Sequence, residues 1–230
     1  MSPSYTSASE ILKNLPGVID HTLLRANATE TEIRKLCIEA KENNFYTVCV
    51  NPRWITTCID ELKLSNTLPI TVIGFPLGAN TLEIKKRECD DCLDLGAKEI
   101  DMVIDVSLAL SHEWKKLEEE IKVFSKLCGR IPLKVIIETA YLNAEQIREA
   151  SKCCLFGGAA FVKTSTGFAP SGAKEDDLGL IRETVGPSMG IKASGGIKTF
   201  ADAERMIKAG ATRIGASASV SIVAEWKKSL

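Results

Sequence analysis

Short apolar segments alternate with helical patterns along nearly the whole chain, and this alternation most restricts the possible folds. Each segment that predicts a β-strand is about four to seven residues long, and a helical pattern follows it. Such strands, with no Asn-Gly hairpin between them, are typical of a parallel sheet covered by helices. We expect strands at residues 18–22, 47–50, 70–75, 99–105, 133–139, 161–165, 191–194 and 213–216.

Eight strand–helix units in 230 residues predict an α/β fold, the (β/α)8 TIM barrel, as a single domain over residues 1–230. A helical segment near residues 7–15 precedes the first strand, so we expect a short extra N-terminal helix. The alternative is an open doubly wound sheet, which commonly carries G-x-G-x-x-G after its first strand. No such motif follows residues 18–22, and we therefore favour the barrel.

Composition argues against two classes of partner. The chain has a formal net charge of −1, with 45% hydrophobic and 26% charged residues. It lacks the positive charge that favours binding to nucleic acid or to an anionic membrane. No apolar run approaches the ~20 residues that span a bilayer, and the polar residues 2–7 show no signal-peptide core. We expect a cytoplasmic protein that binds neither nucleic acid nor membrane.

Neither the cysteines nor the histidines predict a metal site. Several of the eight cysteines lie in apolar runs, where a reduced cysteine behaves as a small buried hydrophobe. The C-x-x-C pair Cys89 and Cys92 lies in a helical pattern, with no second pair or nearby histidine. His21 and His112 are far apart and form no H-E-x-x-H pattern, so we interpret His21 as structural and His112 as a surface residue. We expect no metal and no other cofactor.

Two predicted strands each carry a lysine between apolar neighbours, which is unusual. Lys163 lies in the strand at residues 161–165, and Lys192 lies in the strand at residues 191–194. An ammonium group buried without a partner costs several kcal/mol. If the strands are neighbours, the amines lie about 6 Å apart, and at an effective dielectric near 20 their repulsion is about 3 kcal/mol, roughly two pKa units. A lysine with a pKa lowered in this way is a Schiff-base nucleophile.

Acidic residues share the face of these lysines. In a strand over residues 99–105, the period of two places Asp101 and Asp105 on one face and two hydrophobic residues on the other. Hydrophobic residues suit the helix layer, so we expect both carboxylates to point into the barrel. By the same parity, Lys134 and Glu138 share a face of the next strand. A buried ion-pair network that only fills the barrel centre is the alternative, but two strand lysines favour a reactive site.

Glycine-bearing loops follow the last three predicted strands, where barrels often bind phosphate through backbone N–H groups. Serine hydroxyls beside these glycines would add donors. One such loop alone is often only turn chemistry, but three on adjacent strands predict phosphate binding. The residues concerned are Gly167, Ser194, Gly195, Gly196, Gly215 and Ser217.

These residues and the stretches around them resemble the deoxyribose-phosphate aldolases of the shorter form. The resemblance implies a (β/α)8 barrel and a metal-independent class I aldolase. Its reaction would be the reversible cleavage of 2-deoxy-D-ribose 5-phosphate to acetaldehyde and D-glyceraldehyde 3-phosphate. The implied ligands are therefore a small phosphorylated sugar and aldehydes. The resemblance runs through residues 20–24, 47–52, 72–78, 99–103, 134–139, 161–168, 192–197 and 213–217.

The resemblance also implies roles for individual residues. Lys163 matches the Schiff-base lysine, Lys192 the second lysine that perturbs its pKa and joins the proton relay, and Asp101 the relay carboxylate. The phosphate-loop positions that match are Gly167, Gly195, Gly196 and Ser217. We expect further pocket residues at Asp20, Thr22, Cys49, Asp105, Lys134 and Thr166.

Two features depart from the family pattern. Many relatives are expected to carry asparagine at position 105, whereas this chain has Asp105, whose charge would raise the amine pKa near the lysine pair and oppose activation. The printed chain ends at Lys228-Ser229-Leu230, without the C-terminal tyrosine tail that some members use to assist proton transfer. Both departures concern how protons are handled at the site.

The residues alone leave two other functions open. One is another phosphate-binding barrel enzyme, such as a sugar-phosphate isomerase or a transaldolase-like enzyme. The other is a catalytically silent sugar-phosphate binder. An isomerase needs a base and an electrophile but no reactive amine, and a silent binder needs neither lysine. We also expect a homo-oligomer, a dimer or tetramer, because closed oligomers are common among soluble proteins.

Overall fold

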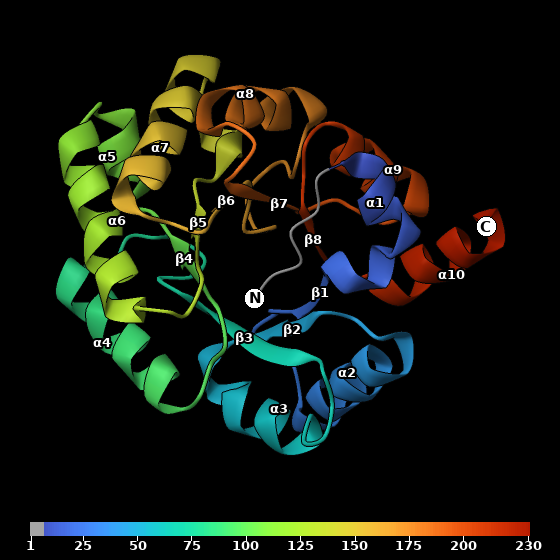
Figure 1. Cartoon of the computed structure of the whole chain (residues 1–230). Coiled ribbons are helices and arrows are strands. Elements are labelled where there is room, and N and C mark those ends of the chain that lie inside the picture. Colours follow the sequence, from blue (N-terminus) through green and yellow to red (C-terminus); the bar gives the residue numbers. More distant parts are fainter. Residues whose placement is uncertain (1–6) are drawn as a thin grey trace.

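Eight parallel strands form the centre of the molecule. The structure is a computed structural model that describes residues 7–230, so most of the polar start at residues 2–7 lies outside the described part. Each strand pairs with the next, and β8 (Arg213–Ala216) pairs with β1 (Ile19–Leu23), which closes the barrel in sequence order. Figure 1 shows the strands at the centre of a ring of helices. The predicted (β/α)8 barrel is confirmed.

The strands lie where the sequence predicts them, but some end earlier than expected. Between β1 and β8 they are β2 (Thr47–Val50), β3 (Leu68–Ile73), β4 (Ile100–Val103), β5 (Leu133–Ile136), β6 (Phe161–Lys163) and β7 (Gly190–Ser194). β2 and β8 have the predicted bounds, whereas β4 and β5 stop before residues 105 and 138. Asp105 caps the next helix, and Glu138 has a left-handed backbone with φ 52°.

Helices surround the strands, and several of them begin at a residue whose side chain caps the helix. α1 is the predicted extra N-terminal helix, and α5 is a short helix that the sequence analysis did not predict. The α-helices are α1 (Ala8–Lys13), α2 (Glu30–Asn43), α3 (Ile55–Glu61), α4 (Leu82–Asp94), α5 (Val106–Leu110), α6 (Trp114–Cys128), α7 (Ala144–Gly157), α8 (Glu175–Val185), α9 (Phe200–Lys208) and α10 (Ser219–Ser229). Three 3-10 turns are η1 (Leu15–Val18), η2 (Pro52–Trp54) and η3 (Thr139–Tyr141). None of the helices within residues 7–230 has the length and apolar character needed to cross a membrane.

The two faces of the strands carry different side chains. Met102 and Ile104 of the fourth strand region pack in the large core between strands and helices, as predicted. A smaller buried apolar group lines the barrel interior near β2 and β3; Val72, which pairs with Asp101 across β3 and β4, belongs to it. Its other members are Leu24, Cys49 and Ile70, with Phe75 packed against them. The rest of the interior holds charged side chains together with apolar ones such as Phe161, whose ring lies beside the Lys134 amine and the Arg213 guanidinium.

Gly78, in the loop after β3, packs tightly against the end of β4. Its φ is +68°, and an added Cβ would lie 1.8 Å from the carbonyl oxygen of Ile104. Gly129 has a similar φ of +58° but no neighbour within 4 Å of an added Cβ. We expect Gly129→Ala to lower the free energy of unfolding by about 1 kcal/mol, and Gly78→Ala to lower it by at least about 2 kcal/mol more. Urea unfolding followed by circular dichroism measures both values, and equal losses would contradict the clash.

Candidate active site

Charged side chains meet inside the barrel, and each is at most 2% exposed. We call them the charge cluster. Burying charges this deeply costs free energy unless each is paired, so their contacts decide which of them are ionised. Within the described residues the charge cluster comprises Asp20, Glu99, Asp101, Lys134, Lys163, Lys192 and Arg213.

Asp101 on β4 lies at the centre of the charge cluster. Its Oδ2 atom accepts hydrogen bonds from the amines of Lys163 at 2.7 Å and Lys192 at 2.8 Å. Its Oδ1 atom accepts one from Lys134 at 2.8 Å. Although burial favours the neutral acid, the three amines hold the pKa of Asp101 well below its usual value. Asp101 is therefore a carboxylate that contacts three lysines at once.

Lys134, Lys192 and Arg213 each contact more than one carboxylate. Lys192 also pairs with Asp20, and the Lys134 amine lies 2.5 Å from a carboxylate oxygen of Glu99. Arg213 contacts Asp20 at 2.9 Å and Glu99 at 3.1 Å. Burial opposes the charged forms, but the neighbouring carboxylates raise the pKa of all three groups above their usual values. These three side chains therefore remain cations.

Lys163 differs from these cations. In the part of the chain that the structure describes, Asp101 is the one carboxylate within 4.0 Å of the Lys163 amine. Burial lowers the pKa of Lys163 from its usual 10.5; Asp101 opposes this shift, and Lys192 adds to it. The charge cluster has four basic groups and three carboxylates, so loss of one proton from Lys163 leaves the cluster neutral.

The two lysines lie side by side, as the sequence predicts, but repulsion is not the leading cause of activation. Lys163 and Lys192 are direct partners in the register of β6 and β7. The larger cause of the lowered Lys163 pKa is burial, and the repulsion from Lys192 ranks below the opposing attraction to Asp101. The predicted repulsion overstates the effect because each amine also binds the same carboxylate oxygen, which screens one charge from the other.

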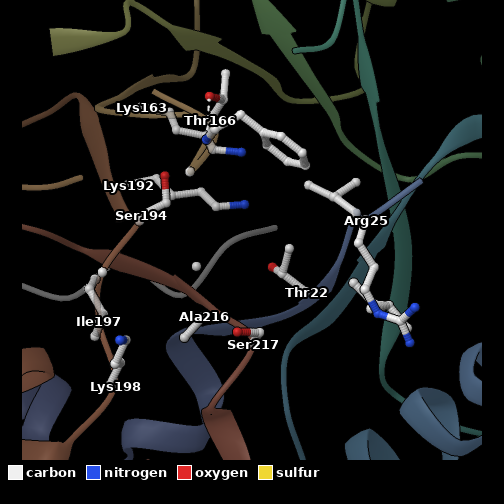
Figure 2. A pocket seen from close by; sticks show the side chains of 17 residues that line it. Thr22, Arg25, Lys163, Thr166, Lys192, Ser194, Ile197, Lys198, Ala216 and Ser217 are labelled. Carbon is white, nitrogen blue, oxygen red and sulfur yellow. Dashed lines mark hydrogen bonds between the residues drawn. The ribbon is translucent and has the colours of Figure 1, made fainter. Parts of the chain in front are cut away.

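Both lysines line a cavity of about 310 Å³ at the C-terminal ends of the strands. Figure 2 shows their amines pointing into the same space, with Thr22 and Ser217 also lining it. Active sites of (β/α)8 barrels lie at this face. A free amine at Lys163 can therefore meet a ligand in the cavity.

The predicted phosphate-loop residues line this same cavity. They are Gly167, Ser194, Gly195, Gly196, Gly215 and Ser217. The prediction that Ser194 offers its hydroxyl to phosphate does not fit the structure, because that hydroxyl donates to the carbonyl oxygen of Ser165 at 2.6 Å. Ser194 thus ties the loop after β7 to the loop after β6. Among the predicted phosphate-loop residues, the backbone N–H groups of the glycines and the Ser217 hydroxyl remain as donors for an anion.

Asp105 does not join the lysines, contrary to the prediction. β4 ends at Val103, and the Asp105 carboxylate accepts a hydrogen bond from the Ser107 N–H at 2.9 Å at the start of α5. It lines a separate surface hollow between α4, α5 and α6. The parity of a strand stops applying where the strand ends, and this is why the prediction is wrong. The charge of Asp105 lies outside the charge cluster and does not oppose activation there.

The other predicted pocket residues fall into two groups. Thr22 and Thr166 line the cavity. Asp20, Cys49 and Lys134 are fully buried inside the barrel and do not line it. Burial raises the pKa of Cys49 to about 11, so its thiol remains protonated near neutral pH.

His21 and the C-x-x-C pair Cys89 and Cys92 do not line the cavity. The His21 Nε2 atom lies 3.0 Å from a carboxylate oxygen of Glu39 on α2, and burial lowers the pKa of His21. This contact is in keeping with the interpretation of His21 as a structural residue. Cys89 and Cys92 are buried in α4 as free thiols, and the Cys89 sulfur lies 3.8 Å from that of Cys128. These thiols pack between helices.

Sequence analysis missed two members of the charge cluster, although a signal for each was present. Glu99 lies two residues before Asp101, so the parity that turned Asp101 inward also applies to Glu99. Arg213 opens β8 and pairs with Lys192 across β7 and β8. A basic residue in an otherwise apolar strand is the same signal that singled out the lysines.

Several cavity residues in loops were also missed. Arg25, Phe168 and Lys198 are among those that line the cavity. The Phe168 ring meets the Phe75 ring edge-on, with centroids 5.3 Å apart. Loops have no period that orients a side chain, so the sequence alone carries no signal for these positions.

The Lys163 amine should lose its proton at lower pH than an ordinary lysine. Because burial lowers its pKa from 10.5, the neutral amine should accumulate as pH rises through a midpoint below 10.5, where Lys192 is still charged. NMR titration of protein with isotope-labelled lysine side chains measures both midpoints, and Lys163→Arg and Lys192→Arg assign the signals. A Lys163 midpoint at or above 10.5 would show that the carboxylates outweigh burial.

Comparison with known proteins gives the family. The DeoC/LacD aldolase family matches residues 17–228, which include every strand of the barrel. A deoxyribose-phosphate aldolase of Caldanaerobacter subterraneus is 49% identical over 222 residues, which are 95% of this chain and 96% of that protein. Deoxyribose-phosphate aldolase 1 of Vibrio vulnificus is 51% identical over 205 residues, 89% of this chain and 94% of that protein.

A solved structure agrees with these sequence matches. The tetrameric deoxyribose phosphate aldolase from Aeropyrum pernix is similar with a TM-score of 0.88 at 31% identity, covering 95% of this chain and 93% of that chain. The similarity thus extends over the whole barrel rather than over one motif. This chain belongs to the DeoC/LacD family of aldolases.

Proposed function

We propose that this protein is a class I aldolase that reversibly cleaves 2-deoxy-D-ribose 5-phosphate to acetaldehyde and D-glyceraldehyde 3-phosphate, in deoxyribose phosphate catabolism. The Lys163 amine carries the proposal, because it lines the cavity, contacts one carboxylate and has a lowered pKa. Such an amine can attack an aldehyde carbon. A sugar-phosphate isomerase or a silent binder has no use for it. The names of the relatives at 49% and 51% identity support the substrate.

The reaction follows from the position of this amine. Lys163 attacks C1 of the open-chain sugar, and loss of water from the carbinolamine forms an imine. A base removes the proton of the C3 hydroxyl, the C2–C3 bond breaks, and its electron pair remains as an enamine at C2. Glyceraldehyde 3-phosphate leaves. Protonation at C2 and hydrolysis of the imine then release acetaldehyde and restore the amine.

Asp101 and Lys192 supply the proton transfers in this proposal. Asp101 lies 2.7 Å from the Lys163 amine, so it can accept and return protons as the carbinolamine forms and collapses. Lys192 lies 2.8 Å from the same oxygen and stays charged, which makes it the acidic partner of the relay. A water in the cavity would extend the relay to C2. No step of this route needs a metal or another cofactor.

The same proposal covers the phosphate, the assembly and the compartment. The phosphate would bind the backbone N–H groups near Gly167, Gly195, Gly196 and Ser217, which line the cavity beside the lysines. A homo-oligomer, dimer or tetramer, is supported by the tetrameric structure of the Aeropyrum pernix relative. A cytosolic location is in keeping with eight free, buried cysteines, because thiols stay reduced there.

Reductive trapping should identify Lys163 as the imine-forming residue. Borohydride reduction in the presence of acetaldehyde, followed by peptide mass mapping, should label Lys163. Lys163→Arg should abolish turnover because a guanidinium does not lose its proton, whereas Lys208→Arg, on the exposed face of α9, should retain it. EDTA should leave wild-type turnover intact. A label on Lys192 with none on Lys163 would refute the assignment.

Replacement of Asp101 should slow proton transfer more than imine formation. Asp101→Asn keeps the shape but removes the base, so we expect kcat to fall by about 10²-fold or more. The variant should still form imine on borohydride trapping, yet exchange the methyl protons of acetaldehyde with solvent slowly. Asp105→Asn is the matched control and should exchange them at close to the wild-type rate, because Asp105 lies outside the charge cluster. Wild-type exchange in Asp101→Asn would rule out the relay.

A further inference from the structure

The chains that leave β5 and β6 run side by side, with one extra residue after β5. The N–H of Ile137 donates to the carbonyl oxygen of Lys163 at 3.0 Å, and the N–H of Thr139 donates to that of Thr164 at 2.9 Å. Donors two residues apart thus meet acceptors one residue apart, which is the pattern of a β-bulge. The extra residue is Glu138, and its φ of 52° is left-handed. A non-glycine residue keeps this strained backbone conformation only where surrounding contacts hold it in place.

The Glu138 side chain makes its hydrogen bonds to one threonine in the loop after β6. Glu138 is 2% exposed, and its two carboxylate oxygens both accept from the Thr166 N–H at 3.2 Å. Its Oε2 atom also accepts from the Thr166 hydroxyl. The oxygen of that hydroxyl accepts in turn from the Phe168 N–H at 3.0 Å. One buried carboxylate therefore orders the backbone on both sides of Gly167.

Residues 166–168 form the part of this loop that faces the cavity. Thr166, Gly167 and Phe168 all line it, whereas Glu138 does not. The Phe168 ring packs edge-on against Phe75, so the loop also sets one side of the cavity. Lys163 lies only three residues before Thr166 on the same chain. A shift of this loop would therefore change the space next to the reacting amine.

We propose that Glu138 is a positioning residue for the substrate phosphate, which holds the loop at residues 166–168 so that the Gly167 N–H and the Phe168 ring face the bound sugar phosphate. The proposal deepens the proposed function and rests on it, since it assumes that a phosphate binds at this loop. A carboxylate suits the task because it only accepts hydrogen bonds, and Thr166 offers it two donors. Glutamine would place an N–H₂ group against one of these donors.

An effect of charge on Lys163 is the alternative. Burial raises the pKa of Glu138 above its usual value, the hydrogen bonds from Thr166 oppose this shift, and Lys163 opposes it further. If Glu138 acted mainly through this charge, its replacement would change kcat equally with phosphorylated and unphosphorylated sugar. If it acts through the loop, the change should appear in KM for the phosphorylated sugar.

The kinetic test compares 2-deoxyribose 5-phosphate with 2-deoxyribose. We expect Glu138→Gln to raise KM for the phosphorylated sugar by about tenfold or more, while kcat/KM for 2-deoxyribose changes by about twofold or less. Glu225→Gln is the matched control. The Glu225 carboxylate accepts a hydrogen bond from the Phe200 N–H at 2.8 Å, and neither residue lines the cavity. Equal losses with both sugars, or an unchanged KM for the phosphorylated sugar, would overturn the proposal.

Substitutions at Thr166 show whether Glu138 acts through this residue. Thr166→Ser keeps the hydroxyl and should raise KM for the phosphorylated sugar much less than Thr166→Val, which removes it. The loss in the double variant Glu138→Gln/Thr166→Val should be smaller than the two single losses combined, because both changes remove the hydrogen bond between the Thr166 hydroxyl and the Glu138 carboxylate. Fully additive losses would contradict the proposed route. If Glu138→Gln fails to fold, the contrast between Thr166→Ser and Thr166→Val decides the question.

Hydrogen exchange tests the loop without any turnover. The amides of residues 166–168 should exchange faster in Glu138→Gln than in wild type, and inorganic phosphate should protect them in wild type but less in the variant. Unchanged exchange in Glu138→Gln would overturn the proposal even if the enzyme cleaves 2-deoxyribose 5-phosphate. Failure of the wild type to cleave that sugar would instead overturn the proposed function, since the exchange measurement requires no reaction.

Discussion

The site depends on one carboxylate that binds three buried lysines. Asp101 accepts hydrogen bonds from Lys134, Lys163 and Lys192, all at 2.7–2.8 Å, in the buried interior of the barrel. Buried charges persist only when they are paired, so the ionisation of each amine depends on how the few carboxylates are shared. Lys163 contacts fewer of them than its neighbours. Burial therefore lowers the pKa of the Lys163 amine, while the carboxylates raise the pKa of Lys134 and Lys192.

In the proposed function, the chemical step and the binding of the phosphate occur in different parts of the barrel. The charge cluster and the apolar group near β2 and β3 are both buried inside it. The glycine loops after β6, β7 and β8 line the cavity above it. Ser194 and Glu138 tie two of these loops to their neighbours through buried hydrogen bonds. In the proposed function, these hydrogen bonds hold the phosphate loops in place relative to the Lys163 amine.

Strand parity predicted much of this site, and it failed where a strand ended. The period of two correctly predicted that Asp101 faces the lysines, and the same rule would have placed Glu99, two residues earlier, on the same face. The same rule wrongly placed Asp105 inside the barrel, because the chain leaves the sheet after Val103 and begins α5 at Val106. Glu138 is a related case: it lies past the end of β5, where a bulge rather than the period of two sets its direction.

The sequence by itself determined the barrel, the order of its strands and the two lysines that pair across β6 and β7. These follow from local periodicity, since apolar alternation needs no knowledge of distant residues. Only the tertiary structure decided which carboxylate each amine contacts, that burial rather than repulsion is the larger cause of the lowered Lys163 pKa, and where the loop residues point. Those properties depend on solvent exclusion and on distances between residues far apart in the chain, such as Asp101 and Lys192, and neither is set by local sequence.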